Sequence, residues 1–297
     1  MTKYNKHQLA IICFISFLIG HRFYTDIPIT EIMQFTELIQ KSLLIFLSFI
    51  LISTLGVSHG ALDGKIIWDE GDSLKNKIKI YSIYTLIVAA GGLLWFKYPF
   101  AGLQLLLLLS VLHFGMSDLK FLGEANQTQK ISWGFIMTFA PIAFHKERAN
   151  EIFYSLTNNS FDNMSLLIIN YLLFTAIFLY IISASQKIMV KRNSKFSDIL
   201  TFLELGLLVV LAYMFDPIVW FAIYFCFLHG IRAIIQLNFK WYPDIVWMTI
   251  FTSPVIFFIL SIDNNYHSNH LLIVFPILAC LTNAHMLLPQ IIKFIKG

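Results

Sequence analysis

Residues 43–57, LLIFLSFILISTLGV, are the stretch that decides the fold. The run is apolar without period-two alternation, so it predicts a helix and not a half-buried strand. Extended to residue 60, it approaches the roughly 20 residues that cross the ~30 Å hydrocarbon core of a bilayer. It is followed by SHGALDGK, residues 58–65, in which His59 and Asp63 stand one helical turn apart. An ionisable pair at the end of such a run indicates more than a lipid anchor.

The composition assigns the whole chain to the same class. Of 297 residues, 58% are hydrophobic and only 13% are charged, about half the charged fraction of soluble domains. The apolar runs are long and unalternated, which excludes a barrel of membrane strands. We therefore expect one all-α integral-membrane domain over residues 1–297, a polytopic bundle of eight to ten helices. The net charge of +4 is small and spread over loops, so we expect no nucleic-acid partner.

Ten candidate spans can be read along the chain, and their flanks set an orientation. The spans are residues 8–24, 43–60, 78–96, 99–117, 131–145, 165–186, 198–215, 217–237, 244–262 and 270–293. With the N-terminus inside and ten alternating spans, only five of the 21 Lys and Arg residues fall outside. These five are Arg22, Lys41, Lys97, Lys146 and Arg148. Positive charge gathers on the cytoplasmic side of membrane proteins, so both termini are predicted inside.

Four of the nine histidines lie deep within even-numbered spans, which all run from the outside inward. They are His59, His113, His229 and His285. Each lies about fourteen residues from the outer end of its span, or roughly 20 Å at about 1.5 Å per residue. Ionisable groups inside a span are costly and usually face partners in the bundle interior. Four imidazoles at one depth therefore predict a metal site or a haem site.

Three acidic residues are placed to support those rings. Asp63 follows His59 by four residues, and Asp118 follows His113 by five. A carboxylate that accepts the free ring N–H fixes the tautomer of a metal-ligating histidine. Glu204 lies about 10 Å inside its span, level with the histidines, where an unpaired carboxylate would cost several kcal/mol. We expect Glu204 to hydrogen-bond a ligating imidazole.

With these residues assembled, the sequence resembles the Brp/Blh-like integral-membrane β-carotene 15,15′-dioxygenase family. The matching stretches run in the family's order from about residue 50. They are GVSHGALD, LLSVLHFGMSD, APIAFHKE, FLELGLLVVLAYMFDPIVWFAIYFCFLHGIRAI and NAHMLLP. The resemblance implies a helix bundle that holds non-haem Fe(II) and uses O2 to cleave the central double bond of β-carotene to retinal. It also implies a link to a microbial rhodopsin, which would receive the retinal.

The resemblance implies three iron ligands in this chain: His59, His113 and His229. After the third, the family reads His-Ser-x-Arg-His, but this chain reads HGIRA, with Ala233 at the position of the last imidazole. Three interpretations stay open. Either His285 completes the set, or the iron has fewer protein ligands, or the chemistry has changed. No catalytic side chain beyond the metal site is expected.

A carotenoid dissolved in the bilayer could enter sideways between helices and meet the metal in a dry, aromatic cavity. The expected lining is Phe114, Trp220, Tyr224, Phe225 and Phe227. The chain is rich in Ile, Lys and Asn, as many bacterial proteins are, so we expect it in the bacterial cytoplasmic (inner) membrane.

Two other functions fit the same residues. The histidines could ligate haem b in an electron-transfer bundle, or the protein could carry a carotenoid or retinoid without cleaving it. Ala233 favours the carrier.

Overall fold

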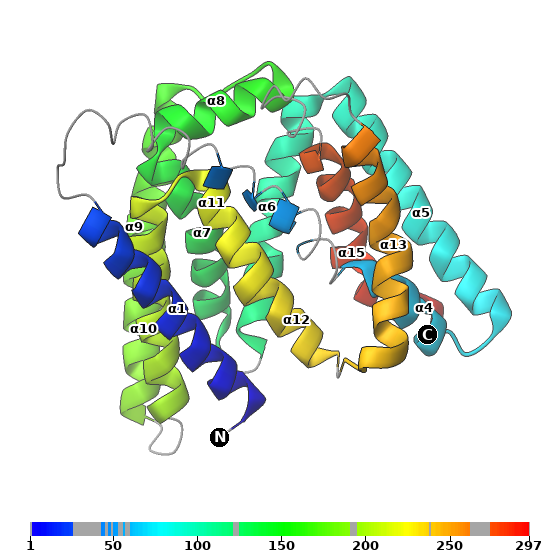
Figure 1. Ribbon diagram of the computed structural model, residues 1–297, viewed down its shortest axis with the longest axis horizontal. Helices are drawn as coiled ribbons and strands as arrows, with labels where there is room; N and C mark the ends of the chain where they lie inside the picture. Colours follow the sequence, from blue (N-terminus) through cyan, green and yellow to red (C-terminus); the bar gives the residue numbers. More distant parts are fainter. Residues whose placement is uncertain are drawn as a thin grey trace. The chain divides into compact units, whose positions relative to one another are not determined.

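The computed structural model describes residues 2–25, 43–44, 47–48, 50–52, 56, 60–120, 125–190, 195–237, 239–261 and 274–296. All regular secondary structure in these ranges is helical (Figure 1). The expected all-α class is confirmed for this part of the chain.

The helix bounds follow the apolar runs closely. The elements are α1 (Lys3–Thr25), α4 (Asp63–Glu70), α5 (Leu74–Lys97), α6 (Pro99–Asp118), α7 (Gln127–Phe144), α8 (Lys146–Thr157), α9 (Asn163–Val190), α10 (Lys195–Met214), α11 (Pro217–Ala222), the π-helix η3 (Ile223–Gly230), α12 (Ile231–Gln236), α13 (Trp241–Ser261) and α15 (Val274–Lys296). The described elements exceed the ten expected for two reasons. The short helices α4 and α8 were not predicted, and the span at 217–237 is divided among α11, η3 and α12. Half of the span at 43–60, His59 included, lies outside the described residues.

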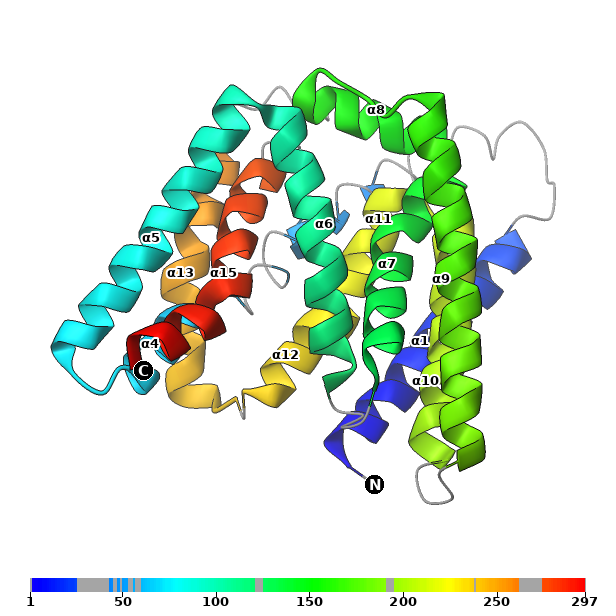
Figure 2. The same cartoon turned by 180° about the vertical axis from the view of Figure 1, so that it is seen from behind.

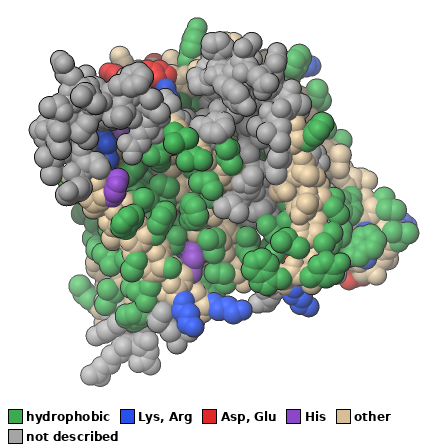
Figure 3. All heavy atoms as spheres, in the orientation of Figure 1, with side chains coloured by type: hydrophobic (Ala, Val, Ile, Leu, Met, Phe, Trp, Pro, Cys, Tyr) green, Lys and Arg blue, Asp and Glu red, His purple; other side chains and the backbone are tan. Residues whose placement is uncertain are grey.

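Within the described residues, six helical segments are long and apolar enough to cross a membrane. They are Leu74–Lys97, Pro99–Asp118, Asn163–Lys187, Phe196–Met214, Pro217–Gln236 and Phe275–Lys296. Large apolar side chains such as Phe174 and Phe178 are more than 60% exposed. Figure 3 shows that hydrophobic side chains cover much of the face it presents, as lipid contact requires. The chain is a multi-pass membrane protein, and the orientation of its termini stays a prediction.

The chain divides into two compact units. Unit 1 comprises Met1–Leu51, Val111–Ala149 and Phe161–Ile235, and unit 2 comprises Ile52–Ser110, Asn150–Ser160 and Gln236–Gly297. In unit 1, α7, α9 and α10 lie side by side, and α1 packs against α10 (Figures 1 and 2). In unit 2, α15 packs along α5, and α4 lies against both (Figure 2). The expectation of a single domain stays a prediction.

Two glycines let the end of α6 approach α7 in unit 1. A Cβ added to Gly115 would overlap the Lys130 carbonyl, and one added to Gly134 would overlap the Val111 carbonyl. Glycine at both positions therefore lets the two backbones touch, as small residues do where membrane helices cross. The crossing brings Trp133 of α7 to the end of α6.

In unit 2, an apolar core fixes the start of α4. Ile67 of α4 packs with Ile80 of α5 and with Leu288 and Ile291 of α15. The Tyr81 hydroxyl, also on α5, donates to the Gly64 carbonyl at 2.6 Å. These contacts hold the first turn of α4, which begins at Asp63.

Candidate metal centre

Two of the predicted histidines meet in unit 1. His113 comes from the last turns of α6, and His229 comes from η3. Their Nε2 atoms are 3.1 Å apart, and the His229 side chain is fully buried. Two histidines 116 positions apart in the sequence therefore place their Nε2 atoms next to each other.

Asp118 fixes the orientation of the His229 ring. His229 Nδ1 lies 2.7 Å from Asp118 Oδ1, and both side chains are fully buried. A carboxylate accepts hydrogen bonds, so Nδ1 carries the proton and Nε2 of neutral His229 keeps its lone pair. The other carboxylate oxygen, Oδ2, accepts from Trp133 Nε1 at 3.1 Å and from the Tyr224 hydroxyl at 2.5 Å. Three donors from two elements, η3 and α7, therefore hold one carboxylate.

The two facing imidazoles suit a divalent metal ion. Metal–imidazole bonds are about 2.1 Å long, and two of them meeting near a right angle put their nitrogens about 3 Å apart. The observed Nε2–Nε2 separation of 3.1 Å matches this value. Asp118 on the far side of His229 is the outer partner that ligating histidines usually have. Two such imidazoles suit a divalent first-row ion, of which iron(II) is one.

Unit 2 contains a second pair of the same design. His285 Nδ1 of α15 lies 2.7 Å from Asp63 Oδ1, and the Tyr84 hydroxyl of α5 donates to Asp63 Oδ2 at 3.0 Å. Asp63 is buried, and the His285 side chain is 19% exposed. As with His229, this contact puts the proton on Nδ1 and leaves a lone pair on Nε2 of the neutral ring.

Both carboxylates support imidazoles as expected, but with different partners. The sequence paired Asp118 with His113 and Asp63 with His59, the histidine nearest to each along the chain. In the structure, Asp118 pairs with His229 and Asp63 with His285. For Asp118 the reason is geometric: His229 approaches from a separate element, whereas His113, five residues earlier on α6, points to a different side of that helix.

The expectation for Glu204 is wrong. Both of its oxygens accept from Arg232 Nη2, at 2.6 and 2.7 Å, and both side chains are fully buried. A guanidinium stays charged at any physiological pH, so it is a stronger partner for a buried carboxylate than a neutral imidazole is. Arg232 lies three residues after His229, and the predicted topology puts it among the basic residues of the inner side. Its place inside an apolar span was the available signal for a buried ion pair.

The predicted aromatic lining packs around His229 and its partners. The Phe114 ring lies edge-on to His229 with centroids 4.9 Å apart, and the Phe225 ring stacks on it at 5.7 Å. Trp220 stacks on Tyr224 at 5.0 Å. Phe227 faces Phe14 of α1 at 5.5 Å. Carotenoid contact by these rings stays a prediction.

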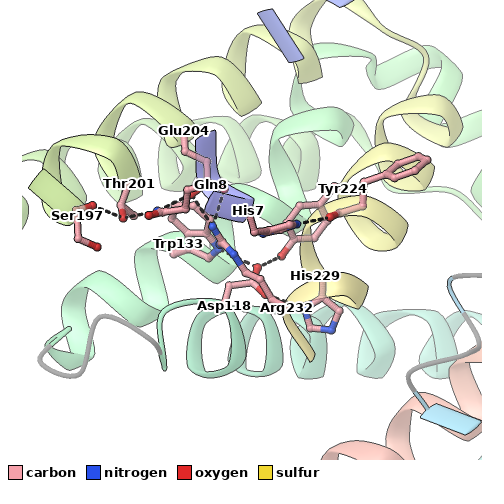
Figure 4. Close-up of polar contacts among 11 residues, drawn as sticks. His7, Gln8, Asp118, Trp133, Ser197, Thr201, Glu204, Tyr224, His229 and Arg232 are labelled. Atoms are coloured by element: carbon pink, nitrogen blue, oxygen red, sulfur yellow. Dashed lines mark hydrogen bonds and ion pairs between the residues drawn. The ribbon is translucent and has the colours of Figure 1, made fainter. Parts of the chain in front are cut away.

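Helix α1 supplies two polar residues that the sequence interpretation did not include. Gln8 is fully buried, and its Nε2 donates to Thr201 Oγ1 at 3.0 Å and to Glu204 Oε2 at 3.3 Å (Figure 4). His7 Nε2 donates to the Phe227 carbonyl at 2.9 Å. Burial and, after it, the charge of Arg232 lower the pKa of His7 to about 4, so this ring is neutral at pH 7. No spacing or motif pointed to either residue.

Two of the four predicted ligands are thus brought together. His59 lies outside the described residues, and His285 belongs to unit 2. Among the side chains that the structure describes, no group of three or more His, Cys, Asp or Glu gathers as a metal site. Convergence of all four histidines on one ion stays a prediction.

Comparison with known proteins identifies a matching family. A family described as Beta-carotene 15,15′-dioxygenase matches residues 50–293. A Beta-carotene 15,15′-dioxygenase from an uncultured marine bacterium 66A03 is 30% identical over 202 residues, covering 64% of this chain and 67% of that protein. No solved structure matches the chain. The matched residues include His113, Asp118, His229 and His285, whereas α1 precedes them.

Proposed function

The chain belongs to the β-carotene 15,15′-dioxygenase family, and on that premise we propose that it cleaves the central 15,15′ double bond of β-carotene, or of a related carotenoid, with O2 to yield retinal. The observation that carries this proposal is the His113–His229 pair. Two imidazole Nε2 atoms 3.1 Å apart, one of them oriented by a buried carboxylate, are ligands ready for a redox metal.

The proposed metal is iron(II), held by His113 and His229, with His59 and His285 as the further ligands. When bound, iron supplies the O2 chemistry that no amino-acid side chain provides. The Asp63–His285 pair supports the inclusion of His285, because it repeats the Nδ1–carboxylate contact of His229 at the same 2.7 Å. A set of neutral imidazoles also leaves positions open for O2 on a divalent ion.

The chain's own residues orient the ligands and keep the site dry. Asp118 accepts the Nδ1 proton of His229, and Trp133 and Tyr224 hold Asp118 in place by donating to its other oxygen. Phe114 and Phe225 pack against two sides of the His229 ring, which is fully buried. Apolar rings at these positions exclude water from the nitrogen donors and suit a hydrocarbon substrate.

The membrane location suits the proposed substrate. Six described helices can cross a bilayer, and β-carotene dissolves in the same hydrocarbon. We propose that the protein resides in the cytoplasmic membrane of a bacterium, where the retinal it releases could serve a rhodopsin.

The test is production of the protein in a β-carotene-accumulating bacterium, with retinal measured by chromatography and iron measured in the purified protein. The wild-type protein should bleach the orange cells and contain iron. His113→Ala and His229→Ala should each abolish retinal formation and lower the iron content. His145→Gln is the matched control, because the His145 ring in the same unit donates to the Ala212 carbonyl, away from the candidate site, and Gln keeps a donor.

Other outcomes would favour the competing functions. Cells that stay orange, with no retinal, around folded wild-type protein would refute the oxygenase. In that case co-purified intact carotenoid would indicate a carrier, for which Ala233 in α12 is the supporting feature. A Soret band would instead indicate haem between the histidines.

A further inference from the structure

The N-terminal helix α1 packs on unit 1 through an apolar stripe interrupted by two polar residues. Ile11, Ile12 and Ile15 are buried, and α1 lies against α10. His7 and Gln8 belong to the same buried side. A polar atom is costly in such a place unless it has a partner. His7 Nε2 and Gln8 Nε2 each have one, whereas His7 Nδ1 and Gln8 Oε1 have none among the described residues. The family match begins at residue 50, so it assigns α1 no role.

Helix α1 contacts Phe227 at two points. His7 Nε2 donates to the Phe227 carbonyl at 2.9 Å, and the Phe14 ring lies 5.5 Å from the Phe227 ring. His7 and Phe14 are seven residues apart, or two helical turns, so they share one face of α1. One helix thus holds both the backbone and the side chain of a residue two positions before His229.

Phe227 lies where the helical hydrogen bonding of this span is irregular. It belongs to the π-helix η3, and the N–H of Ile231 donates to the Leu228 carbonyl. In an uninterrupted α-helix that N–H would reach the Phe227 carbonyl, four residues back. Single-turn π segments change the direction of the side chains that follow and often mark functional sites. The direction of His229 therefore depends on the turn that contains the carbonyl bound by His7.

We propose that His7 is a positioning residue for His229: its hydrogen bond to the Phe227 carbonyl stabilises the π-helical turn that directs the His229 ring toward His113. This role rests on the proposed function only where it concerns metal binding. The other part of the role, the stabilisation of the π-helical turn by the His7 hydrogen bond, does not depend on any metal.

The test compares three full-length variants with the wild-type protein in detergent. His7→Phe keeps a ring but removes the donor. His7→Gln places an amide N–H near the position of Nε2 and should restore the bond. His21→Phe is the matched control, because His21 lies on the same helix and is exposed. Two quantities are measured in each metal-free protein: hydrogen exchange of peptides covering residues 223–236, and Co²⁺ affinity from the visible absorption of the bound ion.

We expect His7→Phe to speed exchange in η3 and to weaken Co²⁺ binding by about twofold to tenfold, the factor that one ordinary hydrogen bond represents. His7→Gln and His21→Phe should match the wild-type protein in both measurements. A merely structural role would not produce rescue by Gln together with a change confined to residues 223–236.

The outcomes separate the two proposals. If wild-type protein binds Co²⁺ and His7→Phe leaves exchange or affinity unchanged, the role of His7 is refuted while the metal site stands. If His7→Gln fails to restore both values, the hydrogen bond is not the cause, and the inference is again refuted. If the wild-type protein binds no Co²⁺, the metal site itself fails, and exchange in η3 alone decides whether His7 holds the turn.

Discussion

The buried Glu204–Arg232 pair gives the prediction that can be worked out furthest. Breaking a buried ion pair by removing one partner costs about 3–5 kcal/mol, because the other charge stays buried. The costs of the two single substitutions, Glu204→Leu and Arg232→Met, should differ, because Asp118 is also fully buried and interacts with the charge of Arg232. Glu204→Leu leaves one cation and one carboxylate. Arg232→Met leaves two carboxylates and no cation.

We therefore expect Arg232→Met to cost about 5 kcal/mol of unfolding free energy and Glu204→Leu about 3 kcal/mol. Replacing both residues removes the pair together with its desolvation cost, so the double variant should lie within about 2 kcal/mol of the wild-type protein. The deficit of Arg232→Met should shrink as pH falls, because a carboxylate left without its cation can take up a proton. The deficit of Glu204→Leu should not shrink, since a guanidinium keeps its charge.

The assay is reversible unfolding in mixed detergent micelles, with the two single variants and the double variant forming a mutant cycle. The exposed pair Lys296–Glu70 is the control: its 2.6 Å contact is as short, but the side chains are 32% and 53% exposed. Removing it should leave the free energy of unfolding nearly unchanged, because water and salt screen an exposed pair. If the buried single variants lose less than about 1 kcal/mol, or if their effects simply add in the double variant, the account of this pair is wrong.

Three further outcomes are expected. Gly134→Ala should destabilise the protein by about 2 kcal/mol or more in the same unfolding assay, because its Cβ would overlap the Val111 carbonyl. The control Gly92→Ala, where a Cβ meets nothing within 4 Å, should be neutral or gain up to about 1 kcal/mol from helix propensity. Equal stability changes in the two variants would contradict the close approach of α6 and α7. Asp118→Asn should lower Co²⁺ affinity or retinal yield by about 10- to 100-fold, because the amide cannot fix the His229 tautomer as a carboxylate does; wild-type values would show that the carboxylate is dispensable. Treatment with a strong iron chelator should stop retinal formation in membranes until Fe²⁺ is returned, and activity that persists in the chelated protein would count against iron.

Much of the fold followed from the sequence because the bilayer leaves few options. A backbone in hydrocarbon must satisfy its hydrogen bonds within the helix, so a run of about 20 apolar residues has one stable form. Helices α5, α6, α9 and α10 accordingly begin and end within a few residues of the predicted spans. The short helices α4 and α8 were missed, because they are too short and too polar to form such a run.

The histidines and acidic residues of the candidate site could also be found in the sequence. A charge or imidazole inside an apolar span is expensive, so His113, His229, Asp118 and Glu204 were visible as groups that need partners. The partners of these groups could not be predicted from the sequence in the same way. Glu204 was expected on an imidazole and instead binds Arg232, and Asp118 was assigned to the wrong histidine.

The sequence by itself determined which segments are helices and which buried groups require compensation, because both follow from the cost of polar atoms in an apolar medium. Only the tertiary structure decided the pairing. His229 meets Asp118, 111 positions earlier in the chain, and His285 meets Asp63, 222 positions earlier, because separate helices bring them together. Hydrogen bonds act over about 3 Å, and helix packing sets distances on that scale, so local spacing along the chain carries no record of them.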